Sequence, residues 1–170
     1  KMPTRHLLPA LLLFLLACPV HAQSSHQSLR QGDQAYDKKE YQNAENAYRK
    51  ALTQSPSDPT ALYNTGNAAY RQGHYEDAVG LYTEAAKQAP DPVFKAQALY
   101  NLGNAHLKQE HYQKAIEAYE QSLRLRPGDG NTKSNLQFAK KKQHEKEQKE
   151  KQQQQNQQQK PQDQQQNQDP

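Results

Sequence analysis

Cysteine is almost absent from this 170-residue sequence, since Cys18 is the only one. A single thiol forms no disulfide within the chain, so the fold has to rest on packing alone. The sequence also lacks an HExxH zinc motif, a pair of cysteines and a glycine-rich phosphate loop. We therefore expect no catalytic residues, no metal site and no bound cofactor.

Charge of one sign does not accumulate over most of the chain. The net charge is +4, yet residues 23–138 contain 13 basic and 13 acidic side chains. A neutral body argues against a surface for nucleic acid. The positive excess lies in residues 139–151, which hold six lysines and three glutamates. Binding of these lysines to anionic lipid or to nucleic acid is the alternative, but the interspersed glutamates favour a solvated helix.

Long hydrophobic runs are equally scarce. The only one, Leu7–Ala17, is too short for a membrane span, which needs about 20 residues. Lys1 and Arg5 precede it and small residues follow it, which is typical of a secretory signal. The sequence thus predicts an exported protein, located in the periplasm or anchored in a membrane and facing the periplasm.

Two processing sites compete at the end of this signal. Val20-His21-Ala22 fits ordinary signal peptidase, which would remove residues 1–22. Leu15-Leu16-Ala17-Cys18 resembles a lipoprotein box, in which residues 1–17 are removed and Cys18 is lipidated. Pro19 directly after the cysteine favours the first alternative, and both stay open at this point.

The body of the chain repeats itself. Residues 32–36 align with residues 66–70 at an offset of 34, and a third copy follows at an offset of 37. The equivalent positions hold Gly32, Gly66 and Gly103, then Tyr48, Tyr82 and Tyr119, and finally Pro56, Pro90 and Pro127. We expect the three extra residues to lengthen the loop around residues 91–95. Self-similarity at about 34 residues is the signature of a helical repeat array.

Each copy predicts two short helices. The glycine of the first helix allows the second helix to approach closely, and the second helix carries a tyrosine between two alanines on one face, as in Ala78, Tyr82 and Ala85. Proline ends the second helix. Because one pair cannot bury its apolar face alone, three pairs should stack into a solenoid.

A further helix over residues 129–150 is predicted to cover the last pair. Asp129, Asn131 and Thr132 are the alternatives for its N-terminal cap. We expect three apolar side chains to pack inward, namely those of Leu136, Phe138 and Ala139. Residues 151–170 are rich in glutamine and lack the apolar residues needed to offset ordering entropy, so we expect a disordered tail.

These repeats resemble the tetratricopeptide repeat (TPR) family. The resemblance rests on Leu62, Gly66, Ala78, Tyr82, Ala85 and Pro90, and on Leu99, Leu102, Gly103, Ala115, Tyr119 and Pro127. It implies an all-α TPR solenoid over residues 25–127, with repeats at about 25–58, 59–92 and 96–129. It also implies a non-catalytic protein that binds other proteins.

A narrower resemblance is to the stand-alone TPR proteins of Bat aerotolerance operons. They are similar in having a secretory signal, three repeats with a longer connection before the third, a helix such as Asn135–Ala139 and a glutamine-rich tail. The resemblance implies an envelope complex with von Willebrand A domain membrane proteins and a role in stress tolerance. The alternative is a TPR lipoprotein that assists the assembly of pili or outer-membrane machinery, which would need the anchor at Cys18.

In TPR proteins the first helices of the repeats line a concave groove. Carried over to this sequence, the groove consists of ten residues, namely Tyr36, Tyr63, Asn64, Asn67, Tyr70, Arg71, Tyr100, Asn101, Asn104 and Lys108. The same face of the first helices also carries Arg30, Asp33, Asp37 and Leu107. One hypothesis is that the asparagines form a ladder that binds the backbone of an extended peptide, because an amide both donates and accepts. The alternative is that they mainly connect neighbouring repeats.

Some TPR domains hold a terminal carboxylate with Lys and Arg at defined positions. In this sequence the matching positions are occupied by Leu29, Asp33, Asn64, Gln97 and Asn101, and only Asn64 fits that pattern. We therefore do not expect a carboxylate clamp of this kind.

Overall fold

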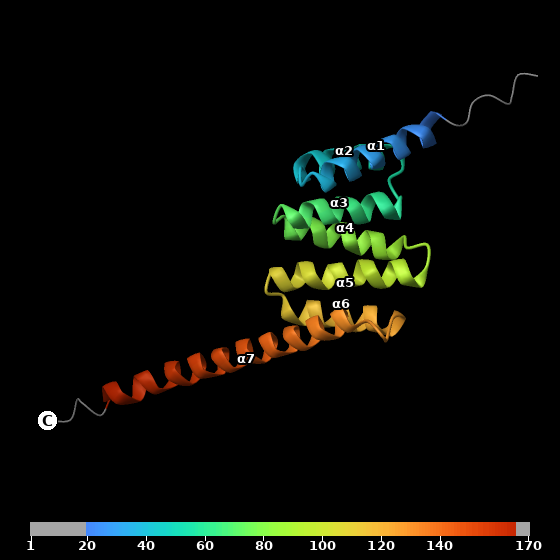
Figure 1. Ribbon diagram of the computed structural model, residues 1–170. Coiled ribbons are helices and arrows are strands. Elements are labelled where there is room, and N and C mark those ends of the chain that lie inside the picture. Colours follow the sequence, from blue (N-terminus) through green and yellow to red (C-terminus); the bar gives the residue numbers. More distant parts are fainter. Residues whose placement is uncertain (1–19, 166–170) are drawn as a thin grey trace, which may run out of the picture.

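The computed structural model describes the backbone of residues 20–165 and the side chains of residues 25–156. Over this range it contains seven α-helices and no strand, stacked in chain order (Figure 1). The helices are α1 (Val20–Asp37), α2 (Tyr41–Gln54), α3 (Pro59–Arg71), α4 (Tyr75–Lys87), α5 (Pro92–Lys108), α6 (Tyr112–Leu125) and α7 (Gly130–Gln165). The prediction of an all-α solenoid of three helix pairs and a C-terminal helix is confirmed.

Aspartates start the first helix of each later pair. The Asp58 carboxylate accepts hydrogen bonds from the backbone N–H groups of Thr60 and Ala61, and Asp91 does the same for Val93 and Phe94. A proline follows each aspartate at the first helical position. Such a cap satisfies donors that have no partner within the helix, and proline fits there because it lacks an N–H.

The turn inside each pair uses one conformation three times. Lys39, Gly73 and Glu110 occupy the same repeat position, and their φ angles are 63°, 82° and 56°. In each turn the next residue donates a backbone hydrogen bond to the carbonyl five residues earlier, as from His74 to Ala69 at 3.0 Å. This arrangement ends one helix and reverses the chain, so the two helices of a pair lie antiparallel.

A glycine and a tyrosine close each pair. A Cβ added at Gly66 would lie 2.8 Å from Cε1 of Tyr82, and one at Gly103 would lie 2.5 Å from Cε1 of Tyr119. Gly32 has the same relation to Tyr48. The rings are almost fully buried. The predicted role of these glycines in close helix approach is confirmed.

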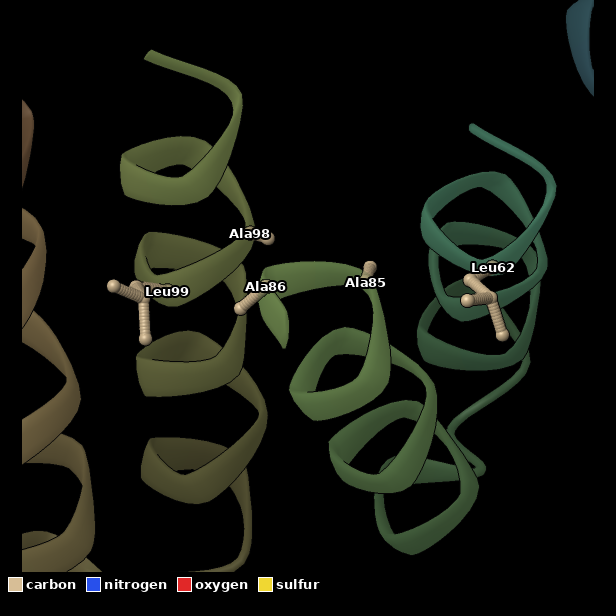
Figure 2. Close-up of a cluster of buried hydrophobic side chains, with 5 residues drawn as sticks. All are labelled: Leu62, Ala85, Ala86, Ala98 and Leu99. Carbon is tan, nitrogen blue, oxygen red and sulfur yellow. The ribbon is translucent and has the colours of Figure 1, made fainter. Parts of the chain in front are cut away.

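Small residues fill the interface between consecutive pairs. Ala85 and Ala86 of α4 lie between Leu62 of α3 and the Ala98–Leu99 step of α5 (Figure 2). All five are buried, so α4 contacts both its own repeat and the next one. Burial of such side chains contributes about 25 cal/mol per Å² of apolar surface, which favours continued stacking.

The three extra residues of the third repeat extend a helix. The connection between α4 and α5 is as short as the one between α2 and α3, whereas α5 has 17 residues and α3 has 13. The expectation of a longer loop is therefore wrong. Asp91 and Pro92 start the helix early, and the ring of Phe94 in the added turn lies 5.5 Å from that of Tyr63.

The helix α7 covers the last pair, as predicted. Among the three alternative caps, Asp129 accepts from the backbone N–H of Thr132 at 2.9 Å. Ala139 is fully buried and Leu136 packs against the cluster that contains Tyr119. The expectation for Phe138 is wrong, because its side chain is 49% exposed. One helical turn separates it from Asn135, which places it on the side of α7 that continues the row of Asn104 rather than the side that faces α6.

The C-terminal part of α7 extends away from the stack (Figure 1). The helix continues to Gln165, so residues 151–165 differ from the disordered tail that their composition predicts. Glutamine and lysine are good helix formers, and α7 is already nucleated on the solenoid, so each further residue adds a backbone hydrogen bond at small entropic cost. Residues 166–170 lie outside the described range.

The predicted signal falls almost entirely outside the described residues, which begin in α1 at Val20. Cys18 and both processing alternatives therefore stay predictions. Over the residues that the structure describes, none of the helices combines the length and the apolar character that a membrane crossing requires.

Candidate peptide-binding groove

Two adjoining hollows lie along the face formed by α1, α3 and α5. The first has a volume of about 190 Å³ and is lined by Asp33, Tyr36, Asp37, Tyr48, Asn64 and Asn67. The second has a volume of about 210 Å³ and is lined by Tyr36, Asn67, Tyr70, Arg71, Tyr82, Asn101 and Asn104. They share Tyr36 and Asn67 and therefore form one groove across consecutive repeats.

The tyrosines of the second helices reach this groove with their hydroxyl groups. Tyr48 donates to Asp33 Oδ1 at 2.9 Å, Tyr82 to Asn67 Oδ1 at 2.9 Å, and Tyr119 to Asn104 Oδ1 at 2.7 Å. Burial raises the pKa of all three phenols. They therefore remain neutral hydrogen-bond donors at any physiological pH.

The asparagines connect one repeat to the next. Asn101 Nδ2 donates to Asn67 Oδ1 at 3.2 Å, and Asn135 Nδ2 of α7 donates to Asn104 Oδ1 at 2.9 Å. The corresponding distance from Asn64 Nδ2 to Asp33 Oδ1 is 3.4 Å. Each acceptor thus serves a tyrosine of its own repeat and an asparagine of the following one. These contacts match the alternative in which the ladder holds the repeats together.

Two further tyrosines support the ladder from within the stack. Asn101 Nδ2 also donates to the Tyr63 hydroxyl at 2.8 Å, and Asn135 Nδ2 to the Tyr100 hydroxyl at 3.3 Å. The Tyr63 ring lies 5.8 Å from the ring of Tyr82 and 5.5 Å from that of Phe94. Burial raises the pKa of Tyr63, while its hydrogen bond with Asn101 opposes that rise.

Arg71 supplies the positive charge of the second hollow. It is the last residue of α3, and its guanidinium carbon lies 4.8 Å from the centre of the Tyr41 ring. Burial raises the pKa of the neighbouring Tyr36, and the charge of Arg71 and its hydrogen bond partly counteract this. Contact with an aromatic face restrains the guanidinium at the rim of the groove.

The ten residues predicted to form the groove divide into three groups. Seven of them line the two hollows, namely Tyr36, Asn64, Asn67, Tyr70, Arg71, Asn101 and Asn104. Tyr63 and Tyr100 lie between repeats, and Lys108 is exposed at the C-terminal end of α5. The binding of a peptide by these ten residues stays a prediction.

Two groove residues escaped the sequence analysis. Tyr48 and Tyr82 were expected only as packing residues, yet their hydroxyl groups line the hollows. The available signal was the constant spacing of 15 residues between each tyrosine and its polar partner on the first helix, as from Asn67 to Tyr82.

No group of three or more His, Cys, Asp or Glu side chains suited to a metal ion occurs among the described residues.

The fold and the groove define an α-helical repeat protein of the protein-interaction class, a fold class that serves as a non-catalytic scaffold. Two family models, each described as tetratricopeptide repeat, match residues 29–93 and residues 96–129. Together they cover more than half of the sequence, and the chain belongs to the TPR family. Among curated proteins, none matches the sequence.

Solved structures agree with this assignment. The Sgt2 TPR domain from Aspergillus fumigatus is 28% identical, with a TM-score of 0.66 over 73% of this chain and 82% of that one. The N-terminal domain of stress-induced protein-1 from C. elegans is 20% identical, with a TM-score of 0.65 over 72% of this chain and 99% of that one. The TPR2AB domain of yeast Sti1, in a complex with pHSP90, is 25% identical with a TM-score of 0.65, over 74% of this chain and 50% of that one.

Proposed function

We propose that this protein binds an extended segment of another polypeptide in the groove formed by α1, α3 and α5. The observation that carries the proposal is the pair of adjoining hollows, lined by phenol, amide and charged side chains from three consecutive repeats. Such side chains offer hydrogen bonds and contact area to a peptide backbone at low entropic cost. The complex of the yeast Sti1 domain supports a polypeptide as the class of ligand for this fold.

The ligand should differ from a chaperone tail that is held by a clamp of basic residues. Four of the five clamp positions hold Leu29, Asp33, Gln97 and Asn101, and none of these is basic. Asp33 would repel a terminal carboxylate, and it already accepts hydrogen bonds from Tyr48 and Asn64. Sequence specificity must therefore come from other residues of the groove.

The groove can be tested by comparing two arginines. Arg71 lines the second hollow. Arg124 is exposed on α6, which is the second helix of its repeat, and it lines neither hollow. A partner should first be identified by cross-linking and pull-down with the mature protein. In calorimetry, R71A should weaken its binding about tenfold, as expected for the loss of a charged hydrogen bond, and R124A should not. Equal affinity of both variants would contradict binding in the groove.

We further propose that the partner is a cell-envelope protein, as in a Bat-type stress complex with von Willebrand A domain membrane proteins. The support is the predicted signal at residues 1–22 and the resemblance to the Bat operon proteins. Export should be tested by fractionation of cells that express the full chain. Recovery of the protein only in the cytosol would contradict this part of the proposal and leave groove binding unaffected.

The second candidate is a lipoprotein that assists the assembly of pili or outer-membrane machinery. It is favoured by the sequence Leu15-Leu16-Ala17-Cys18. Labelling of cells with a fatty acid, compared with the C18S variant, decides between the candidates. Incorporation that depends on Cys18 supports the lipoprotein, and absence of label supports cleavage after Ala22.

A further inference from the structure

The two hollows of the groove carry opposite charges. Asp33 and Asp37 are the acidic side chains of the first hollow, and no basic side chain lines it. Arg71 is the ionised side chain of the second, and no carboxylate lines it. Because the hollows share Tyr36 and Asn67, a negative and a positive site lie next to each other along one groove.

These charges are not neutralised by the protein itself. Among the ion pairs formed by residues 25–156, none includes Asp33, Asp37 or Arg71. Asp33 accepts only from uncharged donors, the Tyr48 hydroxyl and the Asn64 amide. Arg71 lies over the face of the Tyr41 ring. This contact restrains the guanidinium but does not neutralise its charge. Charges of this kind attract complementary groups of a ligand.

We propose that the groove selects a segment that carries both a basic and an acidic side chain. This inference rests on the proposed function, since it specifies the ligand of the same groove. The basic side chain lies over Asp33 and Asp37, and the acidic one pairs with Arg71. The side chains of α1 and α3 meet where Asn64 contacts Asp33, and helices in contact lie about 8 to 10 Å apart. Because an extended peptide advances about 3.3 Å per residue, the two side chains are about three residues apart.

Selection from a phage-displayed library of random peptides on the immobilised full chain tests this inference. Peptides enriched by the wild type should combine Lys or Arg with Asp or Glu at that spacing. The R71E variant makes both hollows negative, so it should enrich peptides with two basic side chains. The R124E variant changes the same charge by the same amount on α6 and should enrich the wild-type pattern.

Affinity measurements complete the test. The best wild-type peptide, synthesised with a fluorescent label, should bind R71E at least tenfold more weakly than R124E in fluorescence anisotropy, because a paired charge becomes a repelled one. Circular dichroism should show both variants folded. If R71E does not fold, R71A serves instead, and its selected peptides should lose the acidic residue.

The failures of this test have different meanings. Enriched peptides that are neutral or of one sign, or that do not respond to R71E, overturn the charge selection and leave the peptide groove in place. A library from which the wild type enriches no peptide at all contradicts groove binding itself, and the charge selection with it.

Discussion

Asn135 of α7 donates a hydrogen bond to Asn104 of α5 over 2.9 Å, one repeat after Asn101 makes the same bond to Asn67. The helix that covers the solenoid is thus joined to it by the contact that joins the repeats to one another. This makes α7 the first helix of a fourth pair that has no second helix among the described residues.

The ladder should therefore contribute to stability. The variant N104A removes the acceptor of the Tyr119 hydroxyl and the closer of the two acceptors of the Asn135 amide, and it should lower the free energy of unfolding by about 2 to 3 kcal/mol. Urea denaturation measures the loss. Asn131, exposed in the first turn of α7, provides the control, and N131A should change little. Equal effects of the two variants would show that the ladder adds nothing to stability.

Two glycines in helices should respond in opposite directions to alanine. G103A forces a Cβ to within 2.5 Å of the Tyr119 ring and should cost about 1 to 3 kcal/mol through overpacking. Gly80 lies in α4 with open space around its added Cβ, so G80A should stabilise the protein by about 0.5 to 1 kcal/mol. Thermal unfolding of both variants checks the pair. A neutral G103A would mean that the tyrosine moves away without cost.

The left-handed turn positions offer a second pair of opposite effects. Lys39 and Glu110 have φ angles of 63° and 56°, a region that costs residues with a Cβ about 1 to 2 kcal/mol. Replacement of either by glycine should raise the midpoint of denaturation, whereas G73A should lower it. If K39G and E110G were as destabilising as G73A, then backbone conformation would not be what limits these turns.

Truncation should separate the packed part of α7 from its solvated part. Removal of all residues after Arg126 exposes the cluster of Ala115, Ile116 and Tyr119, and should lower the midpoint of thermal unfolding by about 10 °C or more. A chain that ends at Gln153 keeps that cluster covered and should unfold within about 2 °C of the full chain. A large loss in this longer variant would mean that the extended part of α7 stabilises the solenoid.

His106 should make the stability depend on pH. Burial lowers the pKa of its imidazole, with smaller contributions from Lys114 and His111, so the unfolded chain binds a proton more readily than the folded one. Stability should fall as the pH drops through about 6.5, the pKa of an unfolded histidine, towards the lower folded value. Denaturation at pH 7.5 and 5.5 measures this change.

The control replaces His106 with the residue found one repeat earlier. H106A copies Ala69 and should show a smaller loss of stability between the two pH values. An identical loss in both proteins would assign the effect to other groups.

The repeat period was enough to predict the helices and their close contacts. Gly66 and Tyr82 recur at fixed offsets, and their contact follows from the need of a large ring for a gap beside a small residue. The groove followed only from the family resemblance, which placed Asn67 and Asn101 on the concave side. The contact that joins Asn101 to Asn67 could not be predicted from the sequence, because an amide side chain is suited both to this contact and to binding a peptide.

Other features depend on which side chains a residue contacts, and the repeat period does not show these contacts. The early start of α5 arises because Asp91 caps the helix and Phe94 finds Tyr63 to pack against. The exposure of Phe138 arises from its register, since hydrophobicity alone favours burial. The opposite charges of the two hollows became visible only when α1 and α3 were placed side by side.

Phe138 interrupts the row of side-chain acceptors that joins each unit of the stack to the next. Asp33, Asn67 and Asn104 each present an oxygen to the next unit, whereas the equivalent position of α7 presents an aromatic ring, whose centre lies 5.7 Å from the Lys142 ammonium. If another helix pair were fused behind α7, the donor asparagine of that pair would find no acceptor at residue 138. A lengthened solenoid would therefore require the substitution F138N.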